Sequence, residues 1–441
     1  MSKKFNTEHI GQFVEGFNLF QGALNGDAES PLGIRRREAF ERFAANGFPT
    51  TKHEEWKYTN VSPIQRTHFR PVLAPEELPE GADDAFGKGF DGDAFRLVFV
   101  NGHFSPERSS IGDMPEGVIV KSLASAIREN TELVTDNIAG YPDTFEHAFA
   151  ALNTAHIRDG AFVFVPKNVV LEKPVFLCYL TVAEGDPVVT YPRTLLVAES
   201  GAQATVVEEF TGRDGDTYLT NAVAEVVVGE NARVDHVVLQ HQSHAAYHVA
   251  ASHARLGRNS NYFNNIISFG GKIARNDPAA ILGGEGGHAS LDGMYLVSQD
   301  QLIDSHTSID HAMPHCTSHE LYKGILRDNG HGVFNGKIFV RKDAQKTDSK
   351  QSNTNLLLSD AAAIDTKPQL EIFADDVKCT HGATIGRLDD SSVFYLRARG
   401  IGKEDARKML VYAFAAEIVE HIGNEDVRAY AATLLDQRLE K

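Results

Sequence analysis

The chain has 441 residues, of which 42% are apolar, enough for a sizeable packed core and incompatible with an unfolded or fibrous protein. Its 60 acidic and 43 basic residues give a net charge of -17, so nucleic acid and anionic membrane surfaces are poor partners. The sequence has neither a signal peptide nor a run of about eighteen apolar residues, which predicts a cytoplasmic chain that does not span a membrane.

Residues 1–95 are predicted to form an N-terminal helical domain. A helix is indicated over Arg35–Asn46 by apolar residues near helical spacing, and Gly47 supplies a stop signal. The only tryptophan, Trp56, follows, and we interpret it as an anchor of this small domain. A loop rich in Pro, Gly, Asp and Glu from about 75 to 95 marks the boundary.

Residues 96–159 are predicted to be a mixed connecting region. Arg96–Asn101 is typical of a strand, and the Asn-Gly pair that begins at Asn101 is a turn signal. Helices are indicated around Ser122–Glu129 and Asp143–His156.

Residues 160–390 consist of short β runs with no helix of crossover length. Small residues open comparable runs at Ala232, Ser260, Ala289 and Ser318, which are 28, 29 and 29 positions apart. Such a recurrence, with a half-step near 14, favours a flattened coil that carries one strand on each side. We therefore predict a mainly β fold with a right-handed parallel β-helix (solenoid) core, with a two-sheet sandwich as the alternative.

Residues 391–441 are predicted to form a C-terminal helical domain. The tail from Lys403 to Lys441 is indicated to be helical, with Glu404 and Asp405 in its first turn, where negative charge favours the helix dipole. It is apolar around more than one face, so it is either deeply buried or presents a face to a partner, and the flanking charges favour a partner. The predicted apolar stripe is Ala406, Leu410, Ala413, Phe414 and Ile418.

Histidines are frequent on the predicted strands. The run from His311 through His315 and Cys316 to His319 could be a zinc site only if a loop or helix made the four side chains converge. The surrounding sequence indicates strand, so we expect solvent-facing strand histidines instead. The full set is His236, His241, His244, His248, His253, His306, His311, His315 and His319.

The densest group of reactive side chains lies in Phe373–Gly386, which contains Cys379 and His381. Residues i and i+2 of a strand point to the same face, so this thiol and imidazole are expected to project together. A sulfur and a nitrogen donor on one surface suit a transition metal or a sulfur-carrying intermediate. A buried cysteine beside a structural histidine is the other interpretation of the same spacing.

Few catalytic motifs are present. The chain has no phosphate-binding G-x-x-x-x-G-K-[ST] loop, no G-x-S-x-G elbow and no H-E-x-x-H helix. Its three cysteines, Cys178, Cys316 and Cys379, are far apart, which predicts reduced thiols, with Cys178 and Cys316 in the core or incidental. A conventional iron-sulfur cluster needs about four thiolates. The chain is therefore not expected to be an enzyme, or to hold a cluster alone.

Several long motifs resemble the SufB/SufD family of iron-sulfur cluster assembly proteins, and Glu54–Thr59 and Lys378–Gly382 are similar to its SufD branch. The similarity covers the N-terminal region and nearly everything from Gly332 onward. The other matching motifs are Asn335–Val340, Gln345–Asp348, Asn353–Leu358, Asp365–Ile372, Ala374–Thr384, Phe394–Ile401 and Tyr412–Glu417.

This resemblance implies a scaffold subunit in a complex with one SufB and two copies of the ATPase SufC. The end of the β-helix would meet SufB, and the C-terminal helices would dock SufC. His381 matches the family histidine at the shared cluster site, as a candidate metal ligand, and Cys379 is its accompanying thiol. Any iron-sulfur cluster would be transient and shared with SufB, and the isolated chain could form a homodimer.

A β-helix carbohydrate-active enzyme is the alternative function. Such an enzyme needs two carboxylates paired across a groove. The adjacent Asp375 and Asp376 would point to opposite faces of a strand, so they cannot form that pair between themselves.

Overall fold

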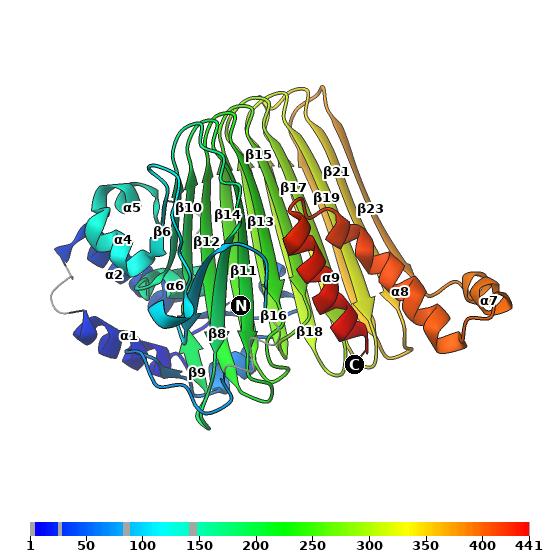
Figure 1. Ribbon diagram of the computed structural model, residues 1–441, viewed down its shortest axis with the longest axis horizontal. Coiled ribbons are helices and arrows are strands. Elements are labelled where there is room, and N and C mark those ends of the chain that lie inside the picture. The colour runs from blue at the N-terminus through cyan, green and yellow to red at the C-terminus, as the bar shows by residue number, and fades with distance from the viewer. Residues whose placement is uncertain (1–4, 25–28, 83–88, 141–147, 441) are drawn as a thin grey trace.

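The computed structural model describes residues 5–24, 29–82, 89–140 and 148–440, and within them the chain winds into a long parallel β-solenoid with helices near both termini (Figure 1). The predicted parallel β-helix class is confirmed, and the sandwich alternative is wrong. Strands alternate between two sheets, and from β10 to β23 each strand pairs in parallel with the strand two steps along the chain. None of the described helices is long and apolar enough to cross a membrane.

We call the two sheets sheet I and sheet II. Sheet I contains, in spatial order, β22 (Ala363–Ile372), β20 (His331–Val340), β18 (Leu302–His311), β16 (Ile273–Leu282), β14 (Tyr247–Leu256), β12 (Tyr218–Val228), β10 (Arg193–Ala198), β7 (Gly160–Val165) and β6 (Ile119–Ser122), with β9 (Val188–Thr190) and β3 (Arg70–Pro71) beside β12. Sheet II contains β23 (Lys378–Gly386), β21 (Asp348–Leu357), β19 (Thr317–Leu326), β17 (His288–Val297), β15 (Asn261–Ser268), β13 (Arg233–Gln240), β11 (Gln203–Gly212), β8 (Val175–Thr181), β4 (Phe95–Val100) and β5 (His103–Phe104).

The repeat expected from the sequence matches the coil length. Consecutive strands of sheet II begin at residues 233, 261, 288 and 317, with one strand of sheet I between each pair. Asn231 and Asn259 adopt left-handed backbone conformations, with φ of 57° and 51°, directly before β13 and β15. Asparagine tolerates that conformation better than most residues, so these positions suit tight corners between coils.

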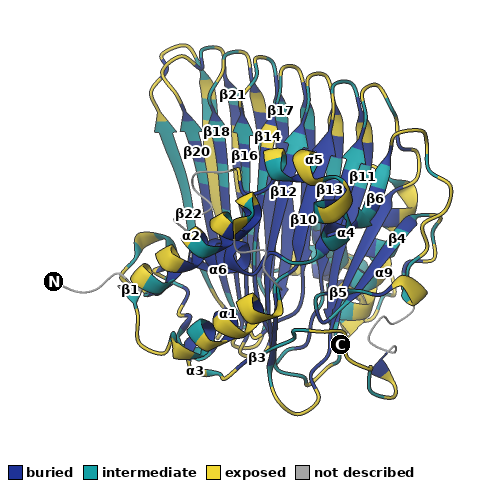
Figure 2. Cartoon of the chain, turned by 90° about the vertical axis from the view of Figure 1, so that its left-hand side faces the viewer, coloured by how far each residue is buried: buried dark blue, intermediate teal, exposed yellow. Residues whose placement is uncertain are grey.

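The inner faces of the two sheets enclose the main core, which runs along the solenoid from Phe95 to Ala374. The outer faces are covered as well. Helices α1 (Gly11–Ala23), α2 (Pro31–Asn46) and α6 (Ala148–Ala155) pack on sheet I, while α4 (Leu123–Glu129) and α5 (Thr131–Asn137) cover its first strands. Burial on both faces explains why many strands lack a clear alternation of apolar and polar residues (Figure 2).

The N-terminal predictions agree with the structure over the described residues. Helix α2 begins after the Ser30 cap and ends at Gly47, whose φ is 70°. Trp56 lies in a short 3-10 helix (Glu54–Trp56) and is buried, as expected for an anchor. Part of the helix expected over 143–156 lies outside the described residues. The remaining short elements are β1 (Phe5–Asn6), β2 (Phe48–Pro49), α3 (Ser62–Arg66) and a 3-10 turn (Pro106–Arg108).

The predicted helical C-terminal region is confirmed, and it is divided into three helices. The chain forms α7 (Asp390–Ala398), α8 (Lys403–Glu420) and α9 (Glu425–Glu440), and α8 and α9 lie across the outer face of sheet II (Figure 1). The buried face of α8 also differs from the predicted stripe, because sheet II selects one of several apolar faces. That face consists of Ala406, Val411, Ala415, Ile418 and Val419.

Candidate functional site

The last coil, β22 and β23, leaves one end of the solenoid open. β22 is the outermost strand of sheet I and β23 of sheet II, and no strand in the described residues pairs with their outer edges. Most β23 side chains are exposed, whereas the interior-facing side chains of β21 are buried. An uncovered edge presents unpaired N–H and C=O groups to another chain. We call the interior-facing residues of β23 the mouth: Cys379, His381, Ala383 and Ile385.

Strand pairing places Cys379 and His381 on one face, as their spacing predicts. Cys379 pairs with Ser349 and His381 pairs with Gln351, and both partners on β21 face the solenoid interior. Cys379 is half-buried and packs against the core, while His381 is exposed. The imidazole is therefore the more accessible donor.

The Cys379 thiol is held in its protonated form. Burial, and then the nearby Asp348 carboxylate, raise the pKa of this thiol above its ordinary value. Because only the thiolate is a strong nucleophile and metal ligand, Cys379 is poorly prepared for either role until a cation lowers its pKa.

Two hydrogen-bonded columns lie directly behind the mouth. Behind His381, Gln351 donates from Nε2 to Glu320 Oε2 over 2.9 Å, and the Thr307 hydroxyl donates to the other carboxylate oxygen of Glu320. Behind Cys379, Ser318 donates to Ser349 over 2.8 Å. Sequence reasoning missed these residues, although a spacing near 30 residues before the mouth would have pointed to Gln351.

Glu320 is an unusual carboxyl group for a solenoid interior. It is fully buried, and desolvation raises its pKa from 4.5 to about 7 despite the hydrogen bonds from Gln351 and Thr307, which act to lower it. The group therefore titrates near neutral pH, two strands behind the exposed imidazole.

The described residues contain no group of three or more His, Cys, Asp or Glu side chains that could hold a metal ion. His311, His315, Cys316 and His319 do not converge into such a group: His311 is buried inside the solenoid, whereas His315 is exposed in the loop before β19. Cys379 and His381 supply two donors, and tetrahedral sites require four. A metal at the mouth would need further ligands from another molecule.

The expectation of solvent-facing strand histidines is wrong for three positions. His236, His248 and His311 are 1%, 0% and 0% exposed and lie inside the solenoid. Burial lowers the pKa of His248 to about 3 and that of His311 to about 4, so both rings stay neutral near pH 7. Many strands are covered on both faces, so alternation along the sequence does not reliably show which histidines face inward.

Asp375 and Asp376 lie in the bend between β22 and β23 rather than on a strand. Both are exposed, and Asp376 forms an ion pair with Lys346. Neither belongs to a pair of carboxylates across a groove, so the residues proposed for a carbohydrate-active enzyme do not provide its chemistry.

The segment around Trp56 connects the N-terminal helices to the outer face of sheet I. The Arg275 guanidinium lies 3.7 Å from the Trp56 ring centre and donates to Asp304 Oδ2 over 3.0 Å. The Thr59 hydroxyl also donates to Asp304, and Glu54 pairs with Lys367 on the edge strand β22. This motif therefore fastens the N-terminal domain to the coils that lead to the mouth.

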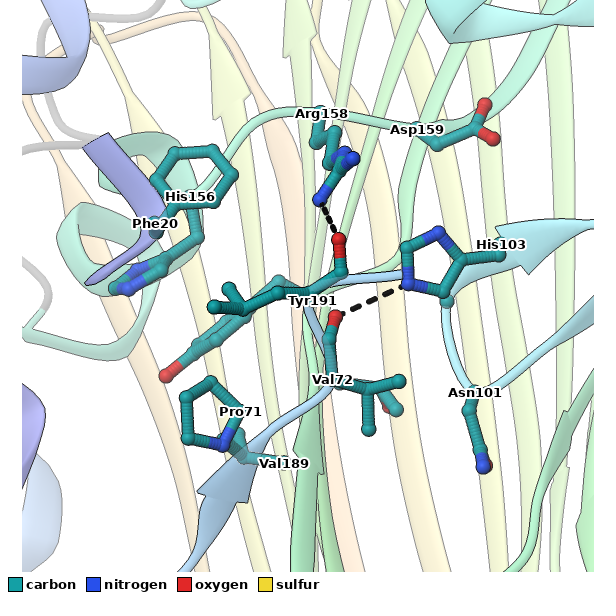
Figure 3. Close-up of a pocket in the computed structure, with 13 residues that line it drawn as sticks. Phe20, Pro71, Val72, Asn101, His103, His156, Arg158, Asp159, Val189 and Tyr191 are labelled. Carbon is teal, nitrogen blue, oxygen red and sulfur yellow. Dashed lines mark hydrogen bonds between the residues drawn. The ribbon is translucent and has the colours of Figure 1, made fainter. Parts of the chain in front are cut away.

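A small pocket with both apolar and polar walls lies near β9, toward the N-terminal coils (Figure 3). It has about 40 Å³ of space, enough for about one or two waters. Its polar groups bond to the backbone: His103 contacts the Val72 carbonyl over 3.0 Å, and Arg158 donates to the Leu73 carbonyl (Figure 3). Asp159 accepts hydrogen bonds from three backbone N–H groups. We assign this pocket a structural role.

A second exposed surface lies on the C-terminal helices. Phe394 and Tyr395 on α7 are 72% and 55% exposed, and Met409 on α8 is 50% exposed. Helix α7 projects past the last coil of the solenoid (Figure 1). Large apolar side chains on a projecting helix are typical of a protein-binding surface.

Comparison with known proteins gives consistent matches over nearly the whole chain. Residues 179–414 match the SufBD core domain of the SUF iron-sulfur cluster assembly system, and residues 7–177 match the SufBD N-terminal region. The chain is 34% identical to the iron-sulfur cluster assembly protein SufD of Escherichia coli, covering 96% of this chain and 95% of that protein. It is also 34% identical to a SufBD family protein of Synechocystis, covering 91% and 90%, and 31% identical to the chloroplastic protein ABCI7 of Arabidopsis thaliana, covering 97% and 90%.

Proposed function

Because the chain belongs to the SufBD family of iron-sulfur cluster assembly proteins, we propose that it is a SufD-type scaffold subunit that shares a nascent cluster with a SufB partner. The cluster is the cargo of this complex, on its way to recipient apo-proteins. The scaffold contributes ligands and shape, and the ATPase activity belongs to SufC.

The open last coil is the observation that supports this function most strongly. It combines uncovered strand edges with an exposed imidazole, His381, and a thiol, Cys379, that faces the same way. Strand edges that pair with a second chain would cover the mouth and bring that chain's ligands to His381. A SufB cysteine at this interface would then share the cluster with His381.

The exposed apolar surface on α7 and α8 supports a separate SufC contact. Phe394, Tyr395 and Met409 lie on helices that follow β23, so SufC would bind near the mouth without filling it. The proposed assembly contains one SufB, one copy of this chain and two SufC, with one SufC bound here.

A His381→Ala variant tests the cluster role. The tagged variant is co-expressed with SufB and SufC, purified anaerobically and reconstituted with iron and a sulfur donor. We expect the complex to assemble normally but to contain less iron and acid-labile sulfide, with weaker cluster absorbance. Thr380→Ala is the matched control, because Thr380 is exposed on the opposite face of β23. Cluster formation equal to the wild type would remove the proposed role of His381.

A further inference from the structure

Gln351 lies between a buried carboxyl group and the exposed histidine of the mouth. Glu320 on β19 pairs in register with Gln351 on β21, and Gln351 pairs in register with His381 on β23. Neighbouring strands lie about 4.8 Å apart, so the three side chains form one row along the inner face of sheet II. Glu320 and Gln351 are 0% and 1% exposed, and the row opens to solvent only at His381.

Hydrogen-bond direction orients the Gln351 amide. Its Nε2 donates inward to Glu320 Oε2 over 2.9 Å, and Glu320 also accepts from Thr307. An amide carries its oxygen and nitrogen on opposite sides of one carbon, so Oε1 is directed away from Glu320. Oε1 is buried and has no hydrogen-bond partner in the structure. A buried acceptor without a donor is unfavourable, so a donor that reaches Oε1 gains a hydrogen bond that the folded chain does not already supply.

A glycine on the opposite sheet makes room for this amide. A Cβ added to Gly336 on β20 would lie 2.3 Å from Gln351 Nε2 and 3.0 Å from its Cδ. The side chain of Gln351 therefore extends across the interior and fills the space above Gly336. The absence of a side chain at Gly336 is what allows the amide to approach β20 this closely.

We propose that Gln351 is a positioning residue for His381: its amide oxygen accepts the N–H of one imidazole nitrogen and directs the other nitrogen out of the mouth. The inference rests on the proposed function of His381. A histidine that binds a metal commonly donates its second ring N–H to an acceptor, which fixes both the tautomer and the ring orientation. Glu320 orients His381 indirectly, because it holds the Gln351 amide in the orientation that places Oε1 toward the mouth.

A Gln351→Met variant tests this role, because methionine has similar length but no amide oxygen. In the reconstituted complex, we expect the initial rate of cluster formation to fall ~10-fold, a typical loss when a supporting acceptor is removed, with the His381→Ala rate as the lower limit. Lys350→Met is the matched control, because Lys350 is exposed on the opposite face of the same strand, and it should leave the rate unchanged.

The double variant Gln351→Met/His381→Ala separates positioning from general structural damage. If Gln351 acts through His381, the double variant forms cluster as slowly as His381→Ala alone. A double variant slower than His381→Ala would overturn the inference. So would a Gln351→Met rate equal to the wild type while His381→Ala is slow. Either result would leave the proposed function standing. A His381→Ala rate equal to the wild type would refute the proposed function itself and the inference with it.

¹⁵N NMR of histidine-labelled, full-length chain provides a second measurement, with the His381 signals identified by their loss in His381→Ala. We expect one neutral tautomer of His381 to predominate in the wild type and a mixture in Gln351→Met. An unchanged tautomer ratio would overturn the inference, because a purely structural role for Gln351 predicts no dependence of this ratio on the amide.

Discussion

Replacing Glu320 with glutamine should change how the stability of the protein depends on pH. The substitution keeps a hydrogen-bonding side chain of the same size between Thr307 and Gln351 but removes the titrating proton. Any difference between the wild type and Glu320→Gln that varies with pH therefore reports the buried carboxyl group.

The magnitude follows from the raised pKa. Burial raises the pKa of Glu320 from 4.5, its ordinary value, to about 7 in the folded protein. Such a group contributes stability that is fully present below the unfolded pKa and is lost as the pH rises through the folded pKa. At about 1.4 kcal/mol per pKa unit, the wild type should lose about 3 kcal/mol between pH 4.5 and pH 8 that Glu320→Gln does not lose.

Thermal melting of both proteins at pH 5, 6, 7 and 8 measures this effect. The Tm of Glu320→Gln relative to the wild type should rise steadily with pH and level off above about pH 8. Asp375→Asn serves as the control, because Asp375 is exposed in the bend before β23. A Tm difference that stays constant across the range would refute the argument that Glu320 is buried with a raised pKa.

Two further predictions concern the ends of the chain. Trp56→Ala should destabilise the protein by about 3–5 kcal/mol, the usual cost of removing a buried aromatic ring. It should also make the N-terminal helices sensitive to limited proteolysis. Lys57→Ala is the control, because this neighbouring side chain is exposed, and it should have neither effect. When this chain is co-expressed with SufC alone, the double variant Phe394→Ser/Tyr395→Ser should no longer co-purify with SufC. Its Tm should stay within about 1 °C of the wild type because both rings are already exposed, and retained SufC binding would place the docking surface elsewhere.

The solenoid was predictable because the same residue types recur at the same point of each coil, so its period can be read from the sequence alone. Small residues such as Ala232 and Ser260 recur directly before sheet II strands, and asparagines such as Asn231 occupy the left-handed corners. The C-terminal helices were harder to predict because α8 is apolar on several sides. Only packing against sheet II selects Val411 and Ala415 as the buried face.

Part of the candidate site was likewise predictable from local sequence, and part was not. The spacing of Cys379 and His381 predicts their common face without any tertiary information, since the period of a strand is two. Glu320 and Gln351 could not be recognised as buried, because their polarity suggests a solvated face. Only the register between β19, β21 and β23 brings them behind His381.

The proposal that SufB binds the last coil depends on the free edge of β23. Lys378 donates its backbone N–H to the carbonyl of Thr347, the residue directly before β21. Residues of a parallel strand alternate between their two neighbouring strands. The odd-numbered residues of β23, among them Ala383, therefore direct their N–H groups toward the free edge. Ala383→Pro removes one edge donor while keeping the ladder to β21.

Native mass measurement of the complex co-purified with SufB and SufC tests this claim most directly. The wild-type chain should give an assembly of one SufB, one copy of this chain and two SufC, and Ala383→Pro should lose SufB while retaining SufC. A wild-type chain that elutes without SufB, or an Ala383→Pro assembly identical to the wild type, would contradict the account.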